Sequence, residues 1–429
     1  MAIFNGDLSA ARQELVDRLN AKISTAIPFI QKRVNLGRGQ VTKANREHGI
    51  MEFYVPASGN AKVGQVSYPV GTNPYPDALN LSGRSRKSSF YKKTCYAQNG
   101  SDILEYSSFE EIFALDDVKK DFIIPRGERM ANEIEKDLVE RNCFKAGGAI
   151  VSATADFLAL SKASAELKSI KALGDWTGYL SPMLESYLST SPLRMAFRAP
   201  DKRIEEMYGK ASIGYYANVD WVEEPFMPVF TSGDAWGSGA KVKTAVSTQG
   251  ATKITLTSVG SGVVVKKGTP FTIDGVYEVT MSGVKQSYLK KFIIQEDATA
   301  DSSGDVEITV LPIYFNGPDG YTNNVWVQGV GNPLVYGIAQ NAAVTMLVDG
   351  ETDYYIGLVR DSEAFNWTPF EWPELLALEN YTTSTDELTI QIAGGANIEG
   401  RTNVIRMDVP YFGDIVDERA VRTLYVKVP

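Results

Sequence analysis

The feature that most constrains the fold of this chain is an apolar stripe within residues 127–146. Its members recur at helical spacing, and they are Met130, Ala131, Ile134, Leu138 and Val139. Such spacing is typical of one face of an α-helix, and a helix of this length is a rod of roughly 30 Å. Charged pairs four residues apart, Lys136 with Glu140 and Asp137 with Arg141, fall on the other faces. The sequence therefore predicts a long helix, ended by the glycines at 147 and 148, that lies across a sheet and is not buried on every side.

The length and composition describe an ordinary globular protein with more than one domain. At 429 residues the chain is long enough for two or three domains, and 44% of its residues are apolar. It has no apolar run of the roughly eighteen residues that a membrane-spanning helix requires, and its first residues lack the pattern of a secretory signal. We therefore expect no membrane contact, and we expect Cys95 and Cys143 to be reduced thiols.

Charge is distributed unevenly along the chain. The first 100 residues carry 14 Lys/Arg and 6 Asp/Glu, a net of +8, and because the whole chain has a formal charge of −9 the remainder carries −17. A basic cluster is interleaved with Phe90 and Tyr91, and it consists of Arg84, Arg86, Lys87, Lys92 and Lys93. Basic residues with aromatic neighbours are typical of single-stranded nucleic-acid binding, but nucleic-acid-binding proteins usually have a basic face overall. We therefore favour contact with another subunit for these five residues, with nucleic-acid binding as the alternative.

Local patterns divide the chain into an N-terminal arm, a helical middle and a β-rich segment. Residues 7–33 repeat apolar side chains at helical spacing, and strand-like pieces at 50–55 and 88–96 flank a segment rich in Gly, Pro and Asn. Two strands that project from a body are marginally stable alone, so this arm predicts a partner surface and an assembly.

Residues 240–311 alternate apolar and polar side chains between turns, which predicts short strands in a small barrel or sandwich inserted into a host domain. Further expected elements are helices at 153–172 and 338–348 and strands at 212–222, 226–230, 354–359, 388–393, 404–409 and 422–428.

A search for catalytic and metal-binding patterns finds no convincing site. The only histidine, His48, lies in a polar loop sequence, and no nucleophile-elbow motif accompanies it. One His and two distant Cys cannot supply a zinc site. The spacing of Asp297, Asp301 and Asp305 departs from that of a calcium loop and predicts a solvated turn. Adjacent acids at 116–117, 205–206 and 223–224 are expected on the surface, so we expect no enzyme activity, no cofactor and no metal.

The order of these elements resembles that of the major capsid proteins of tailed bacteriophages with the Hong Kong 97-like fold. More narrowly, it resembles the subgroup from short-tailed Salmonella-type phages, whose central domain carries an inserted β-barrel. The resemblance covers the layout of essentially the whole chain and rests on no short signature motif. The stretches that carry it are 26–32, 50–56, 109–148, 266–276, 305–309, 388–393, 401–409 and 419–428.

This resemblance implies an α+β fold with an N-terminal helical arm, an elongated two-stranded loop, a spine-helix peripheral domain, a central axial domain and an inserted small β-barrel. The implied divisions are the N-terminal arm at 1–49, the elongated β loop at 50–99, the peripheral domain with the spine helix at 100–149, the first axial part at 150–231, the inserted barrel at 232–336, the second axial part at 337–385, the peripheral strands at 386–411 and the return to the axial domain at 412–429.

The resemblance also implies a function and a set of partners. The protein would be a coat protein that self-assembles into pentamers and hexamers of an icosahedral double-stranded DNA phage head. Its expected partners are copies of itself, a scaffolding protein and a portal protein, while packaged double-stranded DNA would lie inside the shell without specific binding. The expected location is the virion capsid, assembled as a procapsid in the host cytoplasm.

Three other functions stay open at this point. The same fold serves cargo-encapsulating bacterial compartment shells, although the β-rich insert argues against that assignment. A carbohydrate-active enzyme with a β-module is suggested by the acidic pairs and the Trp and Tyr content, and it requires two carboxylates across a cleft. A nucleic-acid-binding arm protein predicts DNA binding that falls steeply with salt and is lost when the five basic residues are removed.

Overall fold

The computed structural model describes the chain in separate stretches, and every structural statement below refers to them. They are residues 50–56, 90–107, 124–170, 175–189, 214–281, 284–314, 324–327, 337–371, 379–384, 389–397 and 402–428. The helix predicted at 7–33, and the arm at 1–49 that contains it, lie outside the described residues. Within them helices and strands are mixed and strands predominate. None of the helices in these stretches is long and apolar enough to cross a membrane.

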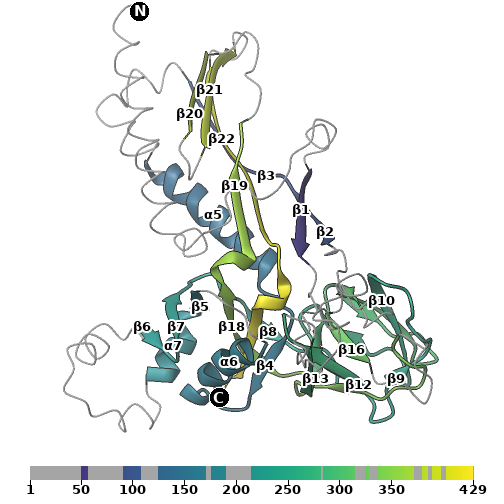
Figure 1. Cartoon of the computed structure of the whole chain (residues 1–429). Helices are drawn as coiled ribbons and strands as arrows, with labels where there is room; N and C mark the ends of the chain where they lie inside the picture. The colour runs from purple at the N-terminus through teal and green to yellow at the C-terminus, as the bar shows by residue number, and fades with distance from the viewer. Residues whose placement is uncertain are drawn as a thin grey trace, which may run out of the picture.

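The predicted long helix is present as α5 (Ile124–Asn142), which runs diagonally beside the upper strands in Figure 1. All five residues of the apolar stripe are buried, so the predicted orientation of the helix is confirmed. The helix begins at an Ile–Pro pair, where the fixed φ of proline suits a first turn. It ends at Asn142, whose side-chain nitrogen donates to the carbonyl of Leu138 (2.8 Å) and whose side-chain oxygen accepts from the amide of Ile415 (3.0 Å).

The helix ends at Asn142, before Gly147 and Gly148, the two glycines that we expected to terminate it. A Cβ atom on Gly147 would stand 2.4 Å from the carbonyl oxygen of Glu418, and one on Gly148 would stand 2.9 Å from Nε of Arg422. The backbone amide of Gly147 also donates to that carbonyl of Glu418 (2.6 Å). The glycines therefore allow the chain after α5 to approach the segment before the last strand, and the prediction that they end the helix is wrong.

α5 lies along a five-stranded antiparallel sheet. Its strands are β3 (Gln98–Ser107), β19 (Phe365–Pro369), β20 (Glu379–Ser384), β21 (Thr389–Asn397) and β22 (Thr402–Ile415). β22 is central, because it pairs with β3, β19 and β21. A Cβ atom on Gly100 of β3 would lie 2.9 Å from Ile134, and one on Gly413 of β22 would lie 2.5 Å from Leu138. The apolar stripe thus rests on the backbone of two strands, as expected of a rod across a sheet.

A seven-stranded sheet forms the second body, below the first in Figure 1. Its strands are β4 (Ala149–Ser152), β5 (Trp176–Leu180), β6 (Gly214–Tyr216), β7 (Val219–Glu223), β8 (Val229–Thr231), β18 (Asp353–Asp361) and β23 (Val421–Lys427). Between β6 and β7, Ala217 and Asn218 have φ of 52° and 69°, the left-handed conformation of a tight hairpin turn. β22 and β23 follow one another closely, so the C-terminal segment joins the two sheets.

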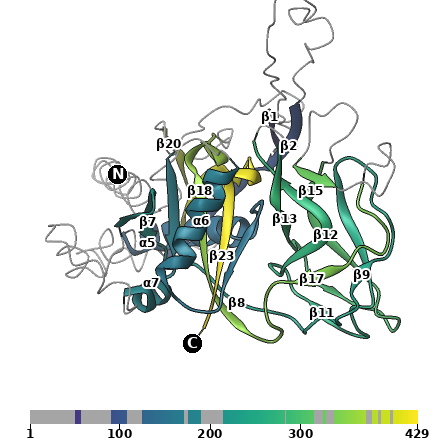
Figure 2. The same ribbon diagram turned by 60° about the horizontal axis from the view of Figure 1, so that its bottom comes forward.

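Two shorter helices accompany the seven-stranded sheet. α6 (Phe157–Ser169) packs on β23 and β4, and Figure 2 shows it in front of β18 and β23. α7 (Pro182–Ser189) contacts β18. α6 begins four residues later than predicted because Asp156 caps it, with a carboxylate that accepts from the amides of Leu158 (2.9 Å) and Ala159 (3.2 Å).

The alternating segment folds into a β-rich insert with its own core, beside the seven-stranded sheet in Figure 2. Its strands are β9 (Lys241–Val242), β10 (Ala251–Thr257), β11 (Val264–Val265), β12 (Pro270–Val279), β13 (Lys285–Ile293), β14 (Ala298–Thr299), β15 (Val306–Ile313), β16 (Val325–Val327) and β17 (Val344–Met346). The strands form sheets of two, three and four strands, and an isolated bridge between Ile294 and Val310 links neighbouring parts. The predicted strands are confirmed, and a single closed barrel stays a prediction.

The helix predicted at 338–348 is wrong. The segment contains β17, which pairs antiparallel with β12 through Val344 opposite Ile273 and Met346 opposite Phe271. Ile338 and Val344 are buried in the core of the insert. The apolar residues of this segment therefore meet strand partners distant in sequence, and the strand pairing of the insert continues past its expected end at residue 336.

The two strands predicted around the Gly/Pro/Asn-rich segment are confirmed as an antiparallel pair. They are β1 (Ile50–Pro56) and β2 (Phe90–Tyr96), with Ile50 opposite Tyr96 and Pro56 opposite Phe90. Figure 1 shows the pair between the long sheet and the insert.

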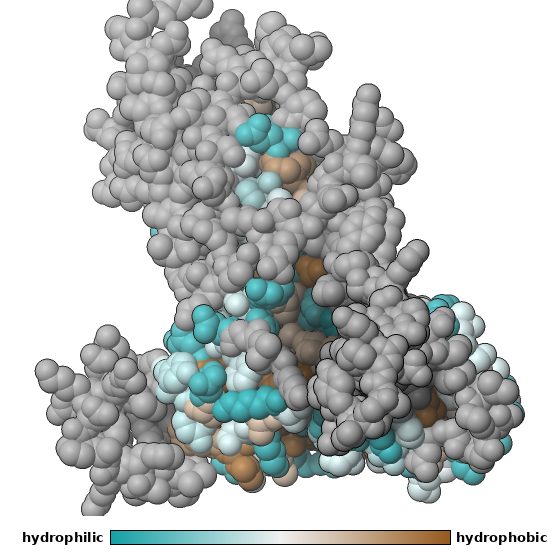
Figure 3. All heavy atoms as spheres, in the orientation of Figure 1, coloured by the Kyte–Doolittle hydropathy of each residue, from teal (hydrophilic) through white to brown (hydrophobic). Residues whose placement is uncertain are grey.

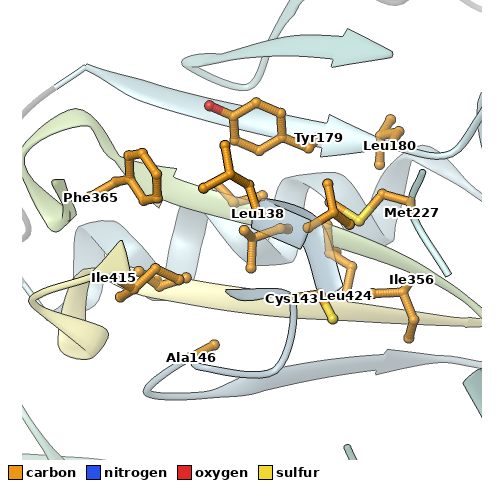
Figure 4. Close-up of a cluster of buried hydrophobic side chains, with 14 of the residues drawn as sticks. Leu138, Cys143, Ala146, Tyr179, Leu180, Met227, Ile356, Phe365, Ile415 and Leu424 are labelled. Atoms are coloured by element: carbon orange, nitrogen blue, oxygen red, sulfur yellow. The ribbon is translucent and has the colours of Figure 1, made fainter. Parts of the chain in front are cut away.

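The main core gathers around the C-terminal end of α5. Figure 4 shows Leu138 and Cys143 beside Tyr179 of β5, Leu424 of β23 and Ile415 of β22. All five side chains are at most 1% exposed. The two sheets therefore share one continuous apolar core with the helix end at its centre.

Candidate inter-subunit contact site

The sequence-predicted contact residues fall on the two-stranded arm, and two of them lie among the described residues. Lys92 and Lys93 belong to β2, where they stand opposite Tyr54 and Phe53 of β1. Arg84, Arg86 and Lys87 lie outside the described residues. The structure therefore places two of the five positions on one strand, and the assignment of all five to a contact stays a prediction.

The arm is anchored at one end by a small apolar cluster. Met51 and Cys95, which face each other in the register, are 3% and 0% exposed and pack with Phe412 and Val416 near the end of β22. Tyr96, the last residue of β2, is 61% exposed. Because a strand rises about 3.3 Å per residue, Lys93 stands about 10 Å beyond Tyr96 along β2. Lys92 and Lys93 thus lie on the part of the arm away from its anchor.

An open groove of ≈ 400 Å³ lies between α5 and the beginning of β3. Its lining includes Asp102, Arg129, Glu133 and Asp137, and is mostly polar. Asp102 also accepts from Arg126 (3.1 Å), which donates to the carbonyl of Ile103 (2.8 Å) as well. On the side of the molecule drawn in Figure 3, the visible described residues are hydrophilic and hydrophobic ones interspersed. A wide polar groove with both signs of charge suits contact with a protein surface.

A charged network joins the insert to the seven-stranded sheet and α6. Lys290 of β13 donates to both carboxylate oxygens of Glu278 of β12 (2.9 and 3.1 Å), and both residues are buried. From the host side, Arg422 of β23 approaches Glu278 (3.8 Å) and Glu166 of α6 (3.4 Å). Glu166 also pairs with Lys291 of β13. Burial lowers the pKa of the Lys290 amine, and the carboxylate of Glu278 opposes that shift.

Neutral hydrogen bonds complete this junction. The hydroxyl of Tyr425 donates to the carbonyl of Gly268 (2.6 Å), and the side-chain nitrogen of Gln295 donates to the carbonyl of Phe144 (3.0 Å). The hydroxyls of Ser169 and Tyr288 are 2.7 Å apart. Directional polar contacts therefore cross the junction, beside apolar ones such as that of Ile293 of β13, which belongs to the main core.

The segment that contains Asp297, Asp301 and Asp305 is a solvated turn, as predicted from the spacing of these acidic residues. Asp301 accepts from the amides of Ser303 (2.8 Å) and Asp305 (2.9 Å), so its carboxylate stabilises the backbone of the turn. Asp297 accepts from the amide of Lys267 (2.6 Å). Among the residues that the structure describes, no three His, Cys, Asp or Glu side chains gather as metal ligands would.

The acidic pairs give one correction. Glu223 is exposed, as predicted, but Glu224 is fully buried, so the expectation of two surface acids is wrong there. Its carboxyl group hydrogen-bonds that of Glu135 on α5. Sequence reasoning missed Glu135, although it stands four residues after Ala131 and four before Val139, within the buried stripe. The pairs at 116–117 and 205–206, and His48, lie outside the described residues.

The two cysteines are both free and buried. Burial raises the pKa of the Cys143 thiol to about 12. A thiol held in this way is protonated at neutral pH and a poor nucleophile, so Cys143 acts as an apolar member of the main core.

Comparisons with known proteins give similar structures but no similar sequence. Neither a family model nor a curated protein sequence matches this chain. The solved structures that it resembles include capsids of phages. The capsid of Ralstonia phage GP4 is 8% identical, with a TM-score of 0.44, and the match covers 92% of this chain and 87% of that one. The acid-stable capsid of Helicobacter pylori bacteriophage KHP30 is 10% identical over 89% and 86% of the two chains, with a TM-score of 0.42.

Proposed function

We propose that this chain is the major capsid protein of a tailed double-stranded DNA phage, with a Hong Kong 97-like fold. In this proposal it self-assembles into pentamers and hexamers of an icosahedral head. The observation that carries the proposal is the layout of the described elements. A long helix lies on a sheet built from strands far apart in the sequence, that sheet is followed along the chain by a strand of the seven-stranded sheet, and a β-rich insert and a two-stranded arm are attached. This is the layout that the sequence resemblance implies.

The geometry of the arm supports an assembly. β1 and β2 form a sheet of two strands, joined to the rest through a small apolar cluster. Two strands alone are marginally stable in water, so a partner surface would stabilise them. When one patch of a subunit binds a different patch of the next, the contacts form a ring where the rotation between subunits closes and an open filament where it does not. A basic arm on an acidic body would give such contacts complementary charge.

The further parts of the proposal follow from the resemblance alone. A scaffolding protein and a portal would take part in assembly, and packaged DNA would lie inside the shell without specific binding. The protein would assemble in the host cytoplasm and end in the virion, with the insert steadying the fold of the subunit. It would act as a structural protein and not as an enzyme.

The proposal is tested by expressing the full chain alone and with its neighbouring reading frames. Sedimentation velocity and negative-stain electron microscopy would then be applied to both preparations. We expect closed shells, spirals or rings of capsomer size in at least one of them. A monomer in both preparations, at high protein concentration, would contradict the proposal.

The contact site is tested by replacing its five basic residues with Gln. We expect fewer assembled particles, because the charge complementary to the neighbouring body is removed, while circular dichroism shows a folded subunit. The matched control replaces Lys241, Lys253 and Lys266, which are exposed on the insert, and leaves the arm unchanged. Normal assembly with lost DNA retention would instead support the nucleic-acid-binding alternative.

A further inference from the structure

The carboxyl pair Glu135–Glu224 connects two bodies of the molecule that the chain builds separately. Glu135 is on α5, the helix of the five-stranded sheet, and is 6% exposed. Glu224 directly follows β7 of the seven-stranded sheet and is 0% exposed. Buried carboxyl groups usually face a cation or several donors, so two of them in contact require an explanation.

The surroundings of Glu224 hold its carboxyl group in place. Its backbone amide donates to the carbonyl of Leu180 (2.8 Å), and its backbone carbonyl accepts from the amide of Met227 (3.2 Å). One carboxylate oxygen accepts from the amide of Phe226 (3.1 Å). The other, and Oε1 of Glu135, are buried without a partner other than the facing carboxyl group. The backbone therefore fixes Glu224, and the helix brings Glu135 to it.

A hydrogen bond between two carboxyl groups needs a proton. Ionised carboxylates only accept, so at least one member of the pair must be protonated for the bond to exist. Burial raises the pKa of Glu135 to about 7 and that of Glu224 to about 8, and the charge of Glu135 adds to the rise at Glu224. The pair therefore keeps a proton near neutral pH, where isolated glutamates have lost theirs.

Among the described residues, ionisable groups of the seven-stranded sheet lie near Glu224. Tyr179 of β5 is close enough to Glu224 for that charge to raise its pKa, as does Asp220 of β7. Arg360 of β18 lies next to Tyr179 and donates to its hydroxyl (3.0 Å), and it lowers the pKa of Tyr179. Arg360 is thus hydrogen-bonded to Tyr179, and Glu135 and Glu224 are held together by a proton.

We propose that Glu135 and Glu224 share a proton that fastens α5 to the seven-stranded sheet, and that losing it at weakly alkaline pH loosens this joint. With both groups ionised, two buried negative charges repel each other across the joint, and the bond between them is gone. The joint concerns the folded subunit and is independent of shell assembly.

The sign of the pH dependence follows from proton binding. The folded chain holds the protons up to pH 7–8, whereas the unfolded chain releases them near the ordinary glutamate value of about 4.3. Between these limits the folded state binds more protons, so stability falls as pH rises. For each proton held, the unfolding equilibrium constant rises about tenfold per pH unit in this window.

The experiment measures urea unfolding of the full-length chain from pH 5.5 to pH 9. The native chain should become less stable up to about pH 8, where the contribution of the pair levels off, and the double variant E135Q/E224Q should show a flatter profile, because two neutral amides keep a hydrogen bond at every pH. The matched control is E133Q, an exposed carboxylate on the same helix, and it should follow the native profile. Equal pH slopes in the native chain and the double variant would overturn the proposal.

A second measurement does not depend on unfolding. Infrared spectra of the native chain at pH 6 should contain a protonated-carboxyl absorption that is absent from the double variant and disappears from the native chain by pH 9. Hydrogen exchange of the α5 amides should be faster at pH 9 in the native chain than in the double variant. If the absorption is missing at pH 6, no proton is shared and the proposal fails.

Discussion

Two contacts, that of α5 with its sheet and that of the insert with its host, differ in the side chains that form them. α5 meets its sheet through an apolar stripe that packs on strand backbone, as at Leu138 against Gly413. The insert meets its host through apolar residues such as Ile293 and also through ions and hydrogen bonds, where Arg422 of the host approaches the Lys290–Glu278 pair of the insert. The first contact gains from removing apolar area from water. The second has to offset the desolvation of charges with directional bonds.

The two kinds of contact therefore contribute differently: one sets how firmly two parts are held together, and the other sets how they are oriented. An apolar stripe tolerates small displacements along the helix, since its contacts have little directional preference. A buried ion pair loses most of its stabilisation when its geometry is disturbed. We therefore expect the charged junction to fix how the insert is oriented, and the apolar stripe to hold the helix on the sheet. Single substitutions on each side test this contrast.

The largest loss is expected from Lys290→Met. The change leaves the carboxylate of Glu278, which is 3% exposed, without its ammonium partner and should lower the free energy of unfolding by about 3–5 kcal/mol. Urea denaturation followed by circular dichroism measures this. The control Lys253→Met also breaks a lysine–glutamate pair between strands of the insert, but an exposed one, and should change nothing measurable. Equal effects of the two variants would show that burial does not govern the junction.

A smaller loss is expected from Leu138→Ala on the apolar side. Leu138 is fully buried against the sheet, so the change removes apolar contact and leaves a cavity, which should lower the free energy of unfolding by about 3 kcal/mol. The effect should be the same at low and high salt, because no charge is involved. Leu158→Ala, at a leucine that is 52% exposed, is the matched control. A Leu138 variant as stable as this control would contradict the assigned role of the stripe.

The sequence predicts best the elements in which apolar residues recur at regular spacing. The stripe of α5 and the alternation in the insert report burial directly, because apolar residues at regular spacing must face one core. The same logic failed at residues 338–348, where Val344 and Met346 pair with β12, a strand more than seventy residues earlier. The glycines after α5 were misread because their reason, a close approach to Glu418, is tertiary.

The charged contacts were beyond sequence reasoning for a related physical cause. Glu224, Lys290 and Arg422 are each buried, whereas charged residues are mostly exposed. Their burial depends on partners that arrive from elsewhere in the chain, so no local pattern reports it. Glu135 is the exception, since its place inside the helical stripe indicates burial. The basic residues of the arm could be found from charge and composition, but the partner surface that they imply lies on another molecule.

The smallest effect is expected from Lys291→Met, and it is the most specific test of the charged junction. Lys291 pairs with Glu166 at a partly exposed position, with 25% and 20% of the two side chains accessible. Pairs of this kind contribute about 1 kcal/mol or less, and salt screens them. We expect a loss near that limit at low ionic strength that shrinks towards zero in molar salt, measured by urea denaturation at both.

Because the buried pair of Lys290 and Glu278 is shielded from ions, the loss caused by Lys290→Met should change far less with salt. If both losses disappeared together in salt, the junction would be a uniform screened surface. If neither changed, Lys291 would act through packing of its methylene chain.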